Sequence, residues 1–413
     1  MIDIFIYAIL SSVSIILAIS YLFYPQKTIS LFLIVGLLTP TSNQFMSYIS
    51  YKGLYFFDFF LISLLIYYLI SLLYSKKIFK KNIFNITLGF CFVTFYLCLA
   101  FSNSIPIDKY LLRDLRPFLT ILYAFVFISL IKKSPISFKG LMNSLTLIFI
   151  CKILFFIIIL FGFSFSDEYY QNNIFRYFDA VTFVSALFLI TSFFMRDLIL
   201  KHISNSYFKL IILLALIIIL ISNLRVLILA LALIFIFSAN VQFFKKIIFT
   251  TFVLLFFLAY SYFIGADRVI NSSDSEIVSV QLLSRFAPAI DKVFEMKPSQ
   301  YVFGLGFGTY FEIPWFAYRS LDTKLNTIDS TYLTLFVKYG LCSFLLILLF
   351  FRLLIFNVFH TKVKRSIIVF YLILFFTISS LYQSGTVFHF LFLNLFFLSI
   401  NDENTSCPIS VNS

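Results

Sequence analysis

The segment NTIDSTYLTLFVKYG (326–340) places residues capable of acid–base chemistry at the start of an apolar run. Asp329 is a carboxylate that could accept a proton from a hydroxyl group. Capping alone would also account for the composition, because Asp329 or Ser330 is a suitable N-cap for a helix that starts at Thr331. Lys338 lies roughly 10 Å further along that helix, from where its side chain could extend to the membrane surface. The segment is therefore either a capped helix or part of a site.

Several arginines could bind phosphate, because a guanidinium group pairs with phosphate oxygens in a bidentate manner. They are Arg113 and Arg116 in YLLRDLRPFLT, Arg176 in NNIFRYFDA, Arg225 in SNLR, and Arg285. Each of them could instead anchor a helix end at lipid headgroups. Arginines that converge on one face would suit a diphosphate lipid.

Two further features could contribute to a site. Lys152 lies near the middle of the apolar run 141–163, where a charge costs about 2.5–3.5 kcal/mol, so we expect it to face the bundle interior and a partner. GLGFG (304–308) has glycine at alternate positions, Gly304, Gly306 and Gly308. It predicts a structural turn or an auxiliary cradle for a diphosphate, and a nucleotide-binding loop is disfavoured because no βαβ unit surrounds it.

Other chemistries lack their residues in the sequence. The histidines are His202, His360 and His389, and none lies in the region around GLGFG. No His/Cys metal cluster, HExxH, GxSxG or Walker motif is present, so we expect neither a metal nor a cofactor. The net charge of +13 comes from residues scattered between apolar runs, which argues against nucleic acid and for membrane topology.

The elements that must position these residues are membrane helices. Hydrophobic residues make up 62% of the chain and charged residues 12%, far from the balance of soluble proteins. A spanning helix needs about 20 mostly apolar residues, and the sequence predicts twelve or thirteen of them. The runs are 4–24, 28–47, 54–74, 83–102, 115–131, 141–163, 178–195, 207–222, 225–240, 247–264, 331–351, 366–382 and 386–400.

The distribution of Lys and Arg orients these helices. One set of alternate connections holds 17 basic residues and the short loops of the other set hold 6, so the first set is expected to be cytoplasmic. The chain then divides into a bundle of about ten helices (1–264), a large external loop (265–330), C-terminal membrane helices (331–400) and a cytoplasmic tail (401–413). Most acidic residues fall on the external face, and with them the polar chemistry.

Within the external loop, residues 280–297 predict an amphipathic helix. Its apolar face comprises Leu282, Leu283, Phe286, Ile290, Val293 and Phe294, and Arg285, Asp291, Lys292 and Glu295 lie largely on another face. Pro288 is expected to kink this helix or to divide it in two. Such a helix would either lie along the membrane interface or pack on the bundle.

The layout resembles the O-antigen polymerase and ligase superfamily of bacterial membrane glycosyltransferases. Three segments carry the resemblance: SNLR (222–225) after a tight external turn, YVFGLGFG (301–308) in the large loop, and IDSTYLTLFVKYGLCSF (328–344) at the start of a helix. Asp329-Ser330 stands where the ligase branch is expected to have a His-Asn pair. The resemblance therefore favours the polymerase branch.

This resemblance implies an all-α, GT-C-like polytopic fold in the bacterial inner membrane with its active face in the periplasm. It implies a metal-independent polymerase that joins undecaprenyl-diphosphate-linked repeat units of O-antigen or a related surface polysaccharide. Its partners would be the lipid-linked glycan donor and acceptor, membrane lipids, a chain-length regulator and a flippase.

Site roles follow from this resemblance together with external placement. Asp329, with Glu312 behind it, is the expected base. The diphosphate would be bound by Arg225, Arg285, Arg176, Arg116 and Arg113, with auxiliary contributions from Gly304, Gly306, Gly308, Lys338, Lys152 and Tyr332. An O-antigen ligase and a flippase or transporter for lipid-linked oligosaccharides remain alternatives; a transporter predicts broken helices in two halves with polar groups near mid-membrane.

Overall fold

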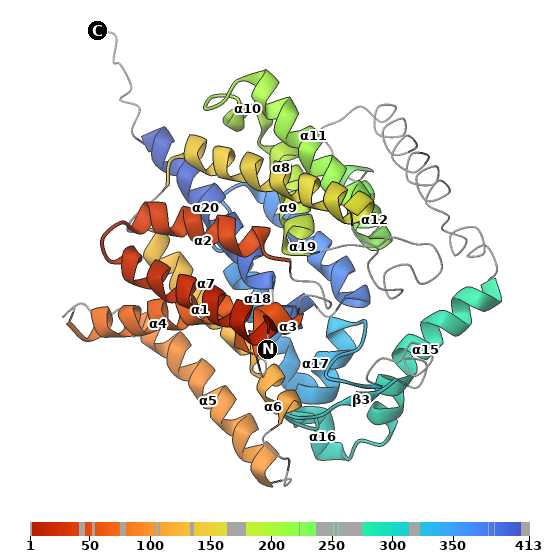
Figure 1. Cartoon of the computed structure of the whole chain (residues 1–413). Helices are drawn as coiled ribbons and strands as arrows, with labels where there is room; N and C mark the ends of the chain where they lie inside the picture. The colour runs from red at the N-terminus through yellow and green to blue at the C-terminus, as the bar shows by residue number, and fades with distance from the viewer. Residues whose placement is uncertain are drawn as a thin grey trace.

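Within the residues that it describes, the computed structural model is helical with two very short sheets (Figure 1). The described residues are 2–40, 46–51, 54–74, 80–102, 105, 108–132, 136–162, 179–222, 224–236, 251, 255, 275–313, 323–378, 380–383 and 385–405. The predicted run 247–264 thus lies almost wholly outside them.

The elements follow the predicted apolar runs closely. The α-helices are α1 (Ile2–Tyr21), α2 (Pro25–Leu38), α3 (Met46–Ile49), α4 (Phe56–Tyr74), α5 (Lys80–Ser102), α6 (Lys109–Asp114), α7 (Arg116–Ile131), α8 (Phe138–Gly162), α9 (Ala180–Phe194), α10 (Arg196–Ile199), α11 (Asn205–Ser222), α12 (Arg225–Ile236), α15 (Ser275–Phe294), α16 (Pro298–Phe303), α17 (Thr331–Tyr339), α18 (Ser343–Leu354), α19 (Thr361–Thr377) and α20 (Thr386–Thr405). Two 3₁₀ turns, η4 (Gly340–Cys342) and η5 (Ser380–Tyr382), follow α17 and α19. The antiparallel pairs are β1 (Ser50–Tyr51) with β2 (Leu54–Tyr55), and β3 (Phe311–Glu312) with β4 (Lys324–Leu325).

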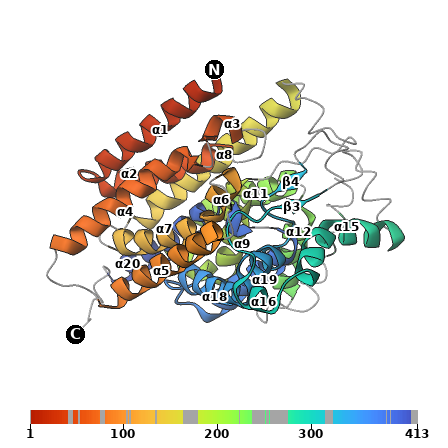
Figure 2. The same cartoon turned by 90° about the horizontal axis from the view of Figure 1, so that it is seen from below.

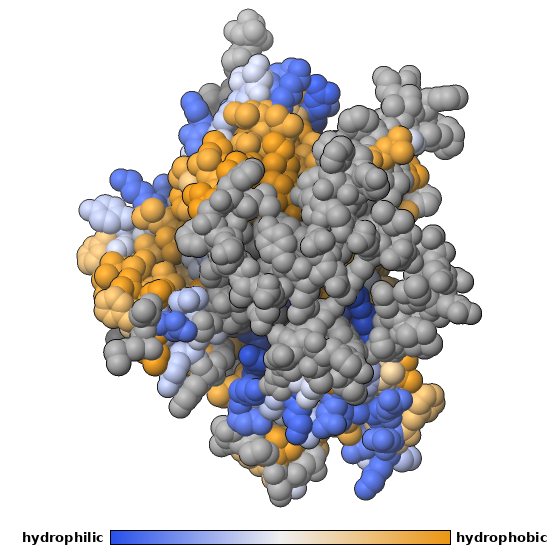
Figure 3. Space-filling view, turned by 45° about the vertical axis from the view of Figure 1, so that its right-hand side comes forward, coloured by the Kyte–Doolittle hydropathy of each residue, from blue (hydrophilic) through white to orange (hydrophobic). Residues whose placement is uncertain are grey.

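Five helical stretches within the described residues are long and apolar enough to cross a membrane. They are Asp3–Tyr21, Lys109–Ile131, Phe138–Ile158, Asn205–Ser222 and Thr331–Leu354. Shorter apolar helices accompany them, including most of α2, α4, α9, α12 and α20. In Figure 3, apolar residues cover much of the flank and hydrophilic residues gather toward the top and bottom. The structure therefore confirms the prediction of a helical protein with several apolar helices that could span a membrane.

Helix ends that were predicted to share the external face do lie together. The first turns of α4 and α7 meet through an ion pair between Asp58 and Arg116. The Thr331 hydroxyl at the start of α17 donates to the Ile378 carbonyl just after α19, at 2.6 Å. After α18, the Asn357 amide donates to Asn394 in the middle of α20. These contacts show which helix ends are neighbours, and the assignment of either end to the external face stays a prediction.

The predicted single helix 331–351 is broken in the middle, at Gly340. Gly340 has φ +56°, and an added Cβ there would lie 2.5 Å from the Tyr301 carbonyl oxygen. A helix that ends inside the bundle leaves its last four carbonyls without partners, and membrane depth offers no water to satisfy them. The Gly340 N–H accordingly donates to the Phe336 carbonyl.

The glycine-rich turn after α16 supplies the next donors. Leu305 N–H donates to the Val337 carbonyl and Gly306 N–H to the Lys338 carbonyl, both at 2.9 Å. The Tyr96 hydroxyl on α5 donates to the Tyr339 carbonyl at 3.1 Å. All four terminal carbonyls of α17 are thus capped, three of them by other parts of the chain. GLGFG is a structural turn, and the N–H of Gly306 is already used within the protein.

α15 and α16 lie beside α17 on one side of the bundle (Figures 1 and 2). α15 continues through Pro288 to Phe294, so the proline does not divide it as one alternative predicted. Phe286 and Val293 pack on a small second core of Ala289, Met296, Phe311, Ile313, Ile328 and Val337. Phe294, which was predicted on the apolar face, is 80% exposed because it ends the helix. At the C-terminus, α20 runs past the predicted end of that span at 400.

Gly304→Ala should destabilise the protein strongly. Gly304 has φ +76° and its added Cβ would lie 2.2 Å from the Lys338 carbonyl oxygen, so left-handed strain of about 1–3 kcal/mol is joined by a backbone clash. Thermal unfolding of the purified protein in detergent should show a clearly lower midpoint. Gly89→Ala is the matched control, because nothing lies within 4 Å of its added Cβ. Equal midpoints for the two variants would contradict this account of the turn.

Candidate functional site

A buried ion pair lies in the interior next to the candidate site, at the end of α17. Lys338 in the last turn of α17 contacts Asp114 at the end of α6, and both side chains are fully buried, at 0% exposure. Two charges in a dry interior persist only when their remaining donors and acceptors are also satisfied.

The partners of Asp114 come from three distant segments. Its Oδ2 accepts from the Gly308 N–H at 2.8 Å, and its Oδ1 accepts from the Asn326 Nδ2 at 2.9 Å. Lys338 Nζ donates to Asp114 Oδ1 and to Asn326 Oδ1, the latter at 2.9 Å. This network ties the glycine turn, the segment before α17 and α6 to one another.

Two tyrosines, Tyr339 and Tyr382, also contact the network. The Tyr339 hydroxyl donates to the Asp114 carbonyl at 3.2 Å and lies 3.2 Å from the Tyr382 hydroxyl. Lys338 Nζ lies 5.4 Å from the centre of the Tyr382 ring. Lys338 is therefore held inside the bundle and does not extend to the membrane surface. Sequence reasoning missed its partner, because Asp114 stands between Arg113 and Arg116 and resembles part of a headgroup anchor.

Arg116 is also committed to an internal contact. Its Nη1 donates to both carboxylate oxygens of Asp58 at 2.8 Å, and its guanidinium lies 4.4 Å from the Tyr55 ring centre. The residue is 5% exposed, so this geometry does not present Arg116 to a substrate as predicted. Arg113, by contrast, is exposed at the end of α6.

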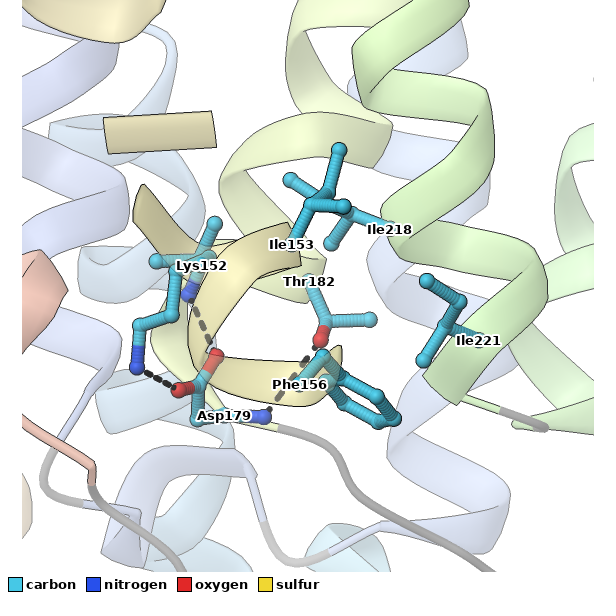
Figure 4. A pocket seen from close by; sticks show the side chains of 8 residues that line it. Lys152, Ile153, Phe156, Asp179, Thr182, Ile218 and Ile221 are labelled. Atoms are coloured by element: carbon cyan, nitrogen blue, oxygen red, sulfur yellow. Dashed lines mark hydrogen bonds and ion pairs between the residues drawn. The ribbon is translucent and has the colours of Figure 1, made fainter. Parts of the chain in front are cut away.

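Lys152 has an interior partner, as we predicted from the free-energy cost of placing a charge in the membrane. Its Nζ lies 2.5 Å from Asp179 Oδ2, and Asp179 also caps α9 by accepting from the Val181 N–H at 3.1 Å. Figure 4 shows the pair beside Thr182 and Phe156. The adjoining cavity has a volume of about 10 Å³, space for about one water molecule. This pair is a structural contact that is remote from the segment before α17.

Asp329 and Arg285 come together at the surface. Arg285 Nη1 lies 3.6 Å from Asp329 Oδ2, and their side chains are 41% and 54% exposed. Ser330 is the N-cap of α17, because its hydroxyl accepts from the Leu333 N–H. The cap is thus provided by Ser330, and the Asp329 carboxylate faces Arg285.

The other predicted residues occupy different surroundings. Glu312 opposes Lys324 across the β3–β4 pair, at 3.9 Å between charged atoms and with both side chains about half exposed or more, 65% and 49%. Tyr332 is half-buried, and its hydroxyl donates to the Leu372 carbonyl at 3.4 Å. The N–H groups of Gly304, Gly306 and Gly308 donate to protein oxygens, so this turn does not offer the predicted diphosphate cradle. Arg176 and the side chain of Arg225 lie outside the described structure.

Among the described residues, no three His, Cys, Asp or Glu side chains are grouped as a metal site would require. The arrangement instead offers an exposed Arg285–Asp329 pair, and Asn326, three residues before Asp329, belongs to the buried network. Such a pair could bind an anionic group through the guanidinium and accept a proton at the carboxylate.

Residues 136–406 match the model of a protein family described as a family of unknown function (DUF6369). Because the match covers more than half of the chain, the protein belongs to this family. No curated protein and no solved structure matches the chain. The matched region contains Lys338, Asn326, Arg285 and Asp329, whereas Asp114 precedes it.

Removing one partner of the Lys338–Asp114 pair should destabilise the protein more than removing both. Asp114→Asn or Lys338→Met alone leaves a buried charge uncompensated, at a cost of about 3–5 kcal/mol. The double variant should recover part of this loss, which a double-mutant cycle of thermal unfolding would measure. Glu312→Gln breaks an exposed pair and serves as the control, with an expected loss of about 0–1 kcal/mol. Additive losses in the cycle would contradict direct pairing.

Proposed function

We propose that this DUF6369 member is a membrane glycosyltransferase that polymerises undecaprenyl-diphosphate-linked oligosaccharide repeat units, of O-antigen or a related surface polysaccharide. The observation that carries the proposal is the exposed Arg285–Asp329 pair, at 3.6 Å. The pair places a phosphate-binding group beside a proton acceptor. Transfer of a glycan from a lipid diphosphate to a hydroxyl group needs both.

In the proposed reaction, a hydroxyl oxygen on the terminal sugar of the acceptor attacks the anomeric carbon of the donor chain. The new glycosidic bond forms as the bond from that carbon to the diphosphate oxygen breaks. Arg285 stabilises the negative charge that develops on the departing lipid diphosphate. Asp329 accepts the proton of the attacking hydroxyl.

The pairing of the two residues suits this division of roles. Before substrate binds, the guanidinium is the counterion of the Asp329 carboxylate. When the diphosphate takes over the guanidinium, because phosphate offers more negative charge, the carboxylate becomes available to the acceptor hydroxyl. The exchange requires both side chains to be accessible, and both are more than one-third exposed.

The backbone around Asp329 is held firmly even though its side chain is exposed. Its neighbour Ser330 is 2% exposed and its hydroxyl also donates to the Phe375 carbonyl of α19 at 3.3 Å. On the other side, Ile328 is buried in the small core under α15. A base that is fixed in this way satisfies the positional demand of general base catalysis.

The remaining predicted cations and the setting of the site are part of the same proposal. Arg225 and Arg176 would add contacts to the diphosphates, and Glu312 would be the second carboxylate. The site would face the periplasm at the bacterial inner membrane, with a GT-C-like arrangement of helices around it. A flippase would deliver the repeat units, and a chain-length regulator would limit the product.

Asp329→Asn should lower polymer formation by about 10²–10⁴-fold, because the amide cannot accept the acceptor proton. Arg285→Ala should also abolish long chains, and Arg285→Lys should restore part of the product. Polysaccharide gels from complemented cells, with the protein quantified by immunoblot, would measure both effects. Asp197→Asn changes an exposed carboxylate on α10 and should retain normal chains. Normal chain length in Asp329→Asn cells would exclude Asp329 as the base.

Loss of the whole protein should leave the saccharide core of the cell surface capped by a single repeat unit. Polymerisation would have stopped in such cells, whereas export and attachment of one unit would continue. A gel of surface polysaccharide from a deletion strain measures this directly. Complete loss of capping would instead support the ligase or the flippase.

A further inference from the structure

The end of α16 exposes apolar side chains although it belongs to the predicted external loop. The helix has six residues and buries none of them. Tyr301, Val302 and Phe303 are each more than one-third exposed, as is Phe294 at the end of α15. The Tyr301 hydroxyl donates to the Val293 carbonyl at 2.9 Å, so the ends of the two helices adjoin. Contiguous apolar surface of this kind typically marks an interaction site.

This apolar surface continues onto Thr331–Leu354, a stretch that is long and apolar enough to span a membrane. An added Cβ on Gly340 would lie 2.5 Å from the Tyr301 carbonyl oxygen and 2.6 Å from that of Val302. The end of α16 therefore packs on the break between α17 and α18. Beyond the break, an exposed apolar stripe follows the helix at spacings of three and four residues, and it consists of Leu341, Phe344, Leu345 and Leu348. On a spanning helix such a stripe faces acyl chains.

Two helices measure the depth of α16 independently. Gly340 is twelve residues from Arg352 through η4 and α18, which is about 20 Å. On α5, the ring of Phe95 lies 5.5 Å from that of Phe303, and Phe95 is fourteen residues from Lys81, which is about 21 Å. We predicted both basic helix ends on the same membrane face. Because the hydrocarbon core is about 30 Å thick, the end of α16 lies about 10 Å inside the opposite face, and any tilt of the helices places it deeper.

The sequence of this segment agrees with such a depth. No Asp, Glu, Lys or Arg lies between Lys297 and Glu312, a run of fourteen mostly apolar residues. A run of this length is too short to span a membrane and is typical of re-entrant or interfacial segments. After α16 the chain returns toward the membrane surface, because Gly308 lies against Ile105, which is beyond the end of α5.

The backbone of the glycine turn also meets the requirement of this depth. A non-helical segment can lie in the hydrocarbon only where protein groups satisfy its N–H and carbonyl groups. The N–H groups of Leu305 and Gly306 donate to α17, and that of Gly308 donates to a buried carboxylate. The Gly304 N–H donates to the Gln300 carbonyl at 2.7 Å. These donors therefore stay paired when the segment enters the bilayer.

We propose that residues 298–308 form a re-entrant segment, which enters the bilayer from the side of Asp329 and returns to it, and that Tyr301, Val302 and Phe303 contact lipid acyl chains. This part of the predicted external loop is thus held within the membrane. The lipid contact anchors the glycine turn to the bilayer, in addition to its hydrogen bonds with α17. The partner is the apolar interior of one leaflet, so the contact involves neither a headgroup nor a lipid-linked substrate.

Quenching of tryptophan fluorescence by brominated lipid tests this contact. The full-length protein has one tryptophan, Trp315, so a Trp315→Phe background accepts a single reporter, Phe303→Trp or Val302→Trp. In nanodiscs of phosphatidylcholine, bromine on the acyl chains should lower the emission of both reporters as much as that of Phe344→Trp in the exposed stripe. Iodide in the aqueous phase should leave them unchanged. Asp291→Trp, at an exposed position of α15, should respond to iodide and not to bromine.

Two results would overturn the proposal. The first is a response of both reporters to iodide alone, as expected for Asp291→Trp, because the segment would then lie in water. The second is shielding of both reporters from bromine and from iodide, because a second copy of the chain or another protein would then cover them.

A charge gives a second readout, which does not depend on a tryptophan fitting beside α5. Val302→Asp should lower the midpoint of thermal unfolding in nanodiscs, because a carboxylate is costly among acyl chains. Val302→Leu should match the wild type, and so should Ser299→Asp at the exposed start of α16. A surface position in water would tolerate all three changes, so equal midpoints would also contradict the re-entrant segment. Neither measurement involves transfer of a glycan, so the results are independent of the proposed function.

Discussion

The end of α17 inside the bundle is the constraint on which the rest of the site depends. Its last three residues, Val337, Lys338 and Tyr339, are 0% exposed, so water cannot satisfy their carbonyls and other segments must bring donors to them. The glycine turn brings two N–H groups and α5 brings the Tyr96 hydroxyl. Because this contact fixes the turn, Gly308 can reach Asp114 from α6. One broken helix thus determines where the loop, α6 and Lys338 must lie.

The charges of the protein separate into two classes with different physical roles. Among the described residues, three acid–base pairs are buried, at Asp58–Arg116, Lys152–Asp179 and Lys338–Asp114. Each carboxylate accepts a further hydrogen bond from a backbone N–H, whereas Nε and Nη2 of Arg116 are buried without a hydrogen-bond partner. Such pairs specify which helices meet, because any other packing would leave a charge alone in the interior. In the Arg285–Asp329 pair both side chains are more than one-third exposed, so these charges can exchange partners without disturbing the packing.

Sequence reasoning located the helices well and the long-range contacts poorly. Hydropathy indicates where each helix lies, and the cost of a charge in the membrane correctly predicted a partner for Lys152. The partner of Lys338 is 224 residues away, and no local pattern encodes such a distance. Arg116 was assigned to a substrate because its contact with Asp58, 58 residues earlier, is equally invisible. The structure shows that Arg285 and Asp329 are paired. Their roles in phosphate binding and proton transfer remain predictions.

The long separation of Lys338 and Asp114 has a consequence for biogenesis. α6 and α7 are synthesised well before α17, so Asp114 is present in the chain before Lys338 is made. A lysine entering alone would be opposed by about 2.5–3.5 kcal/mol. The waiting aspartate offsets this cost as soon as the helices meet. The order of synthesis therefore places the buried counterion of Lys338 in the chain before the lysine itself.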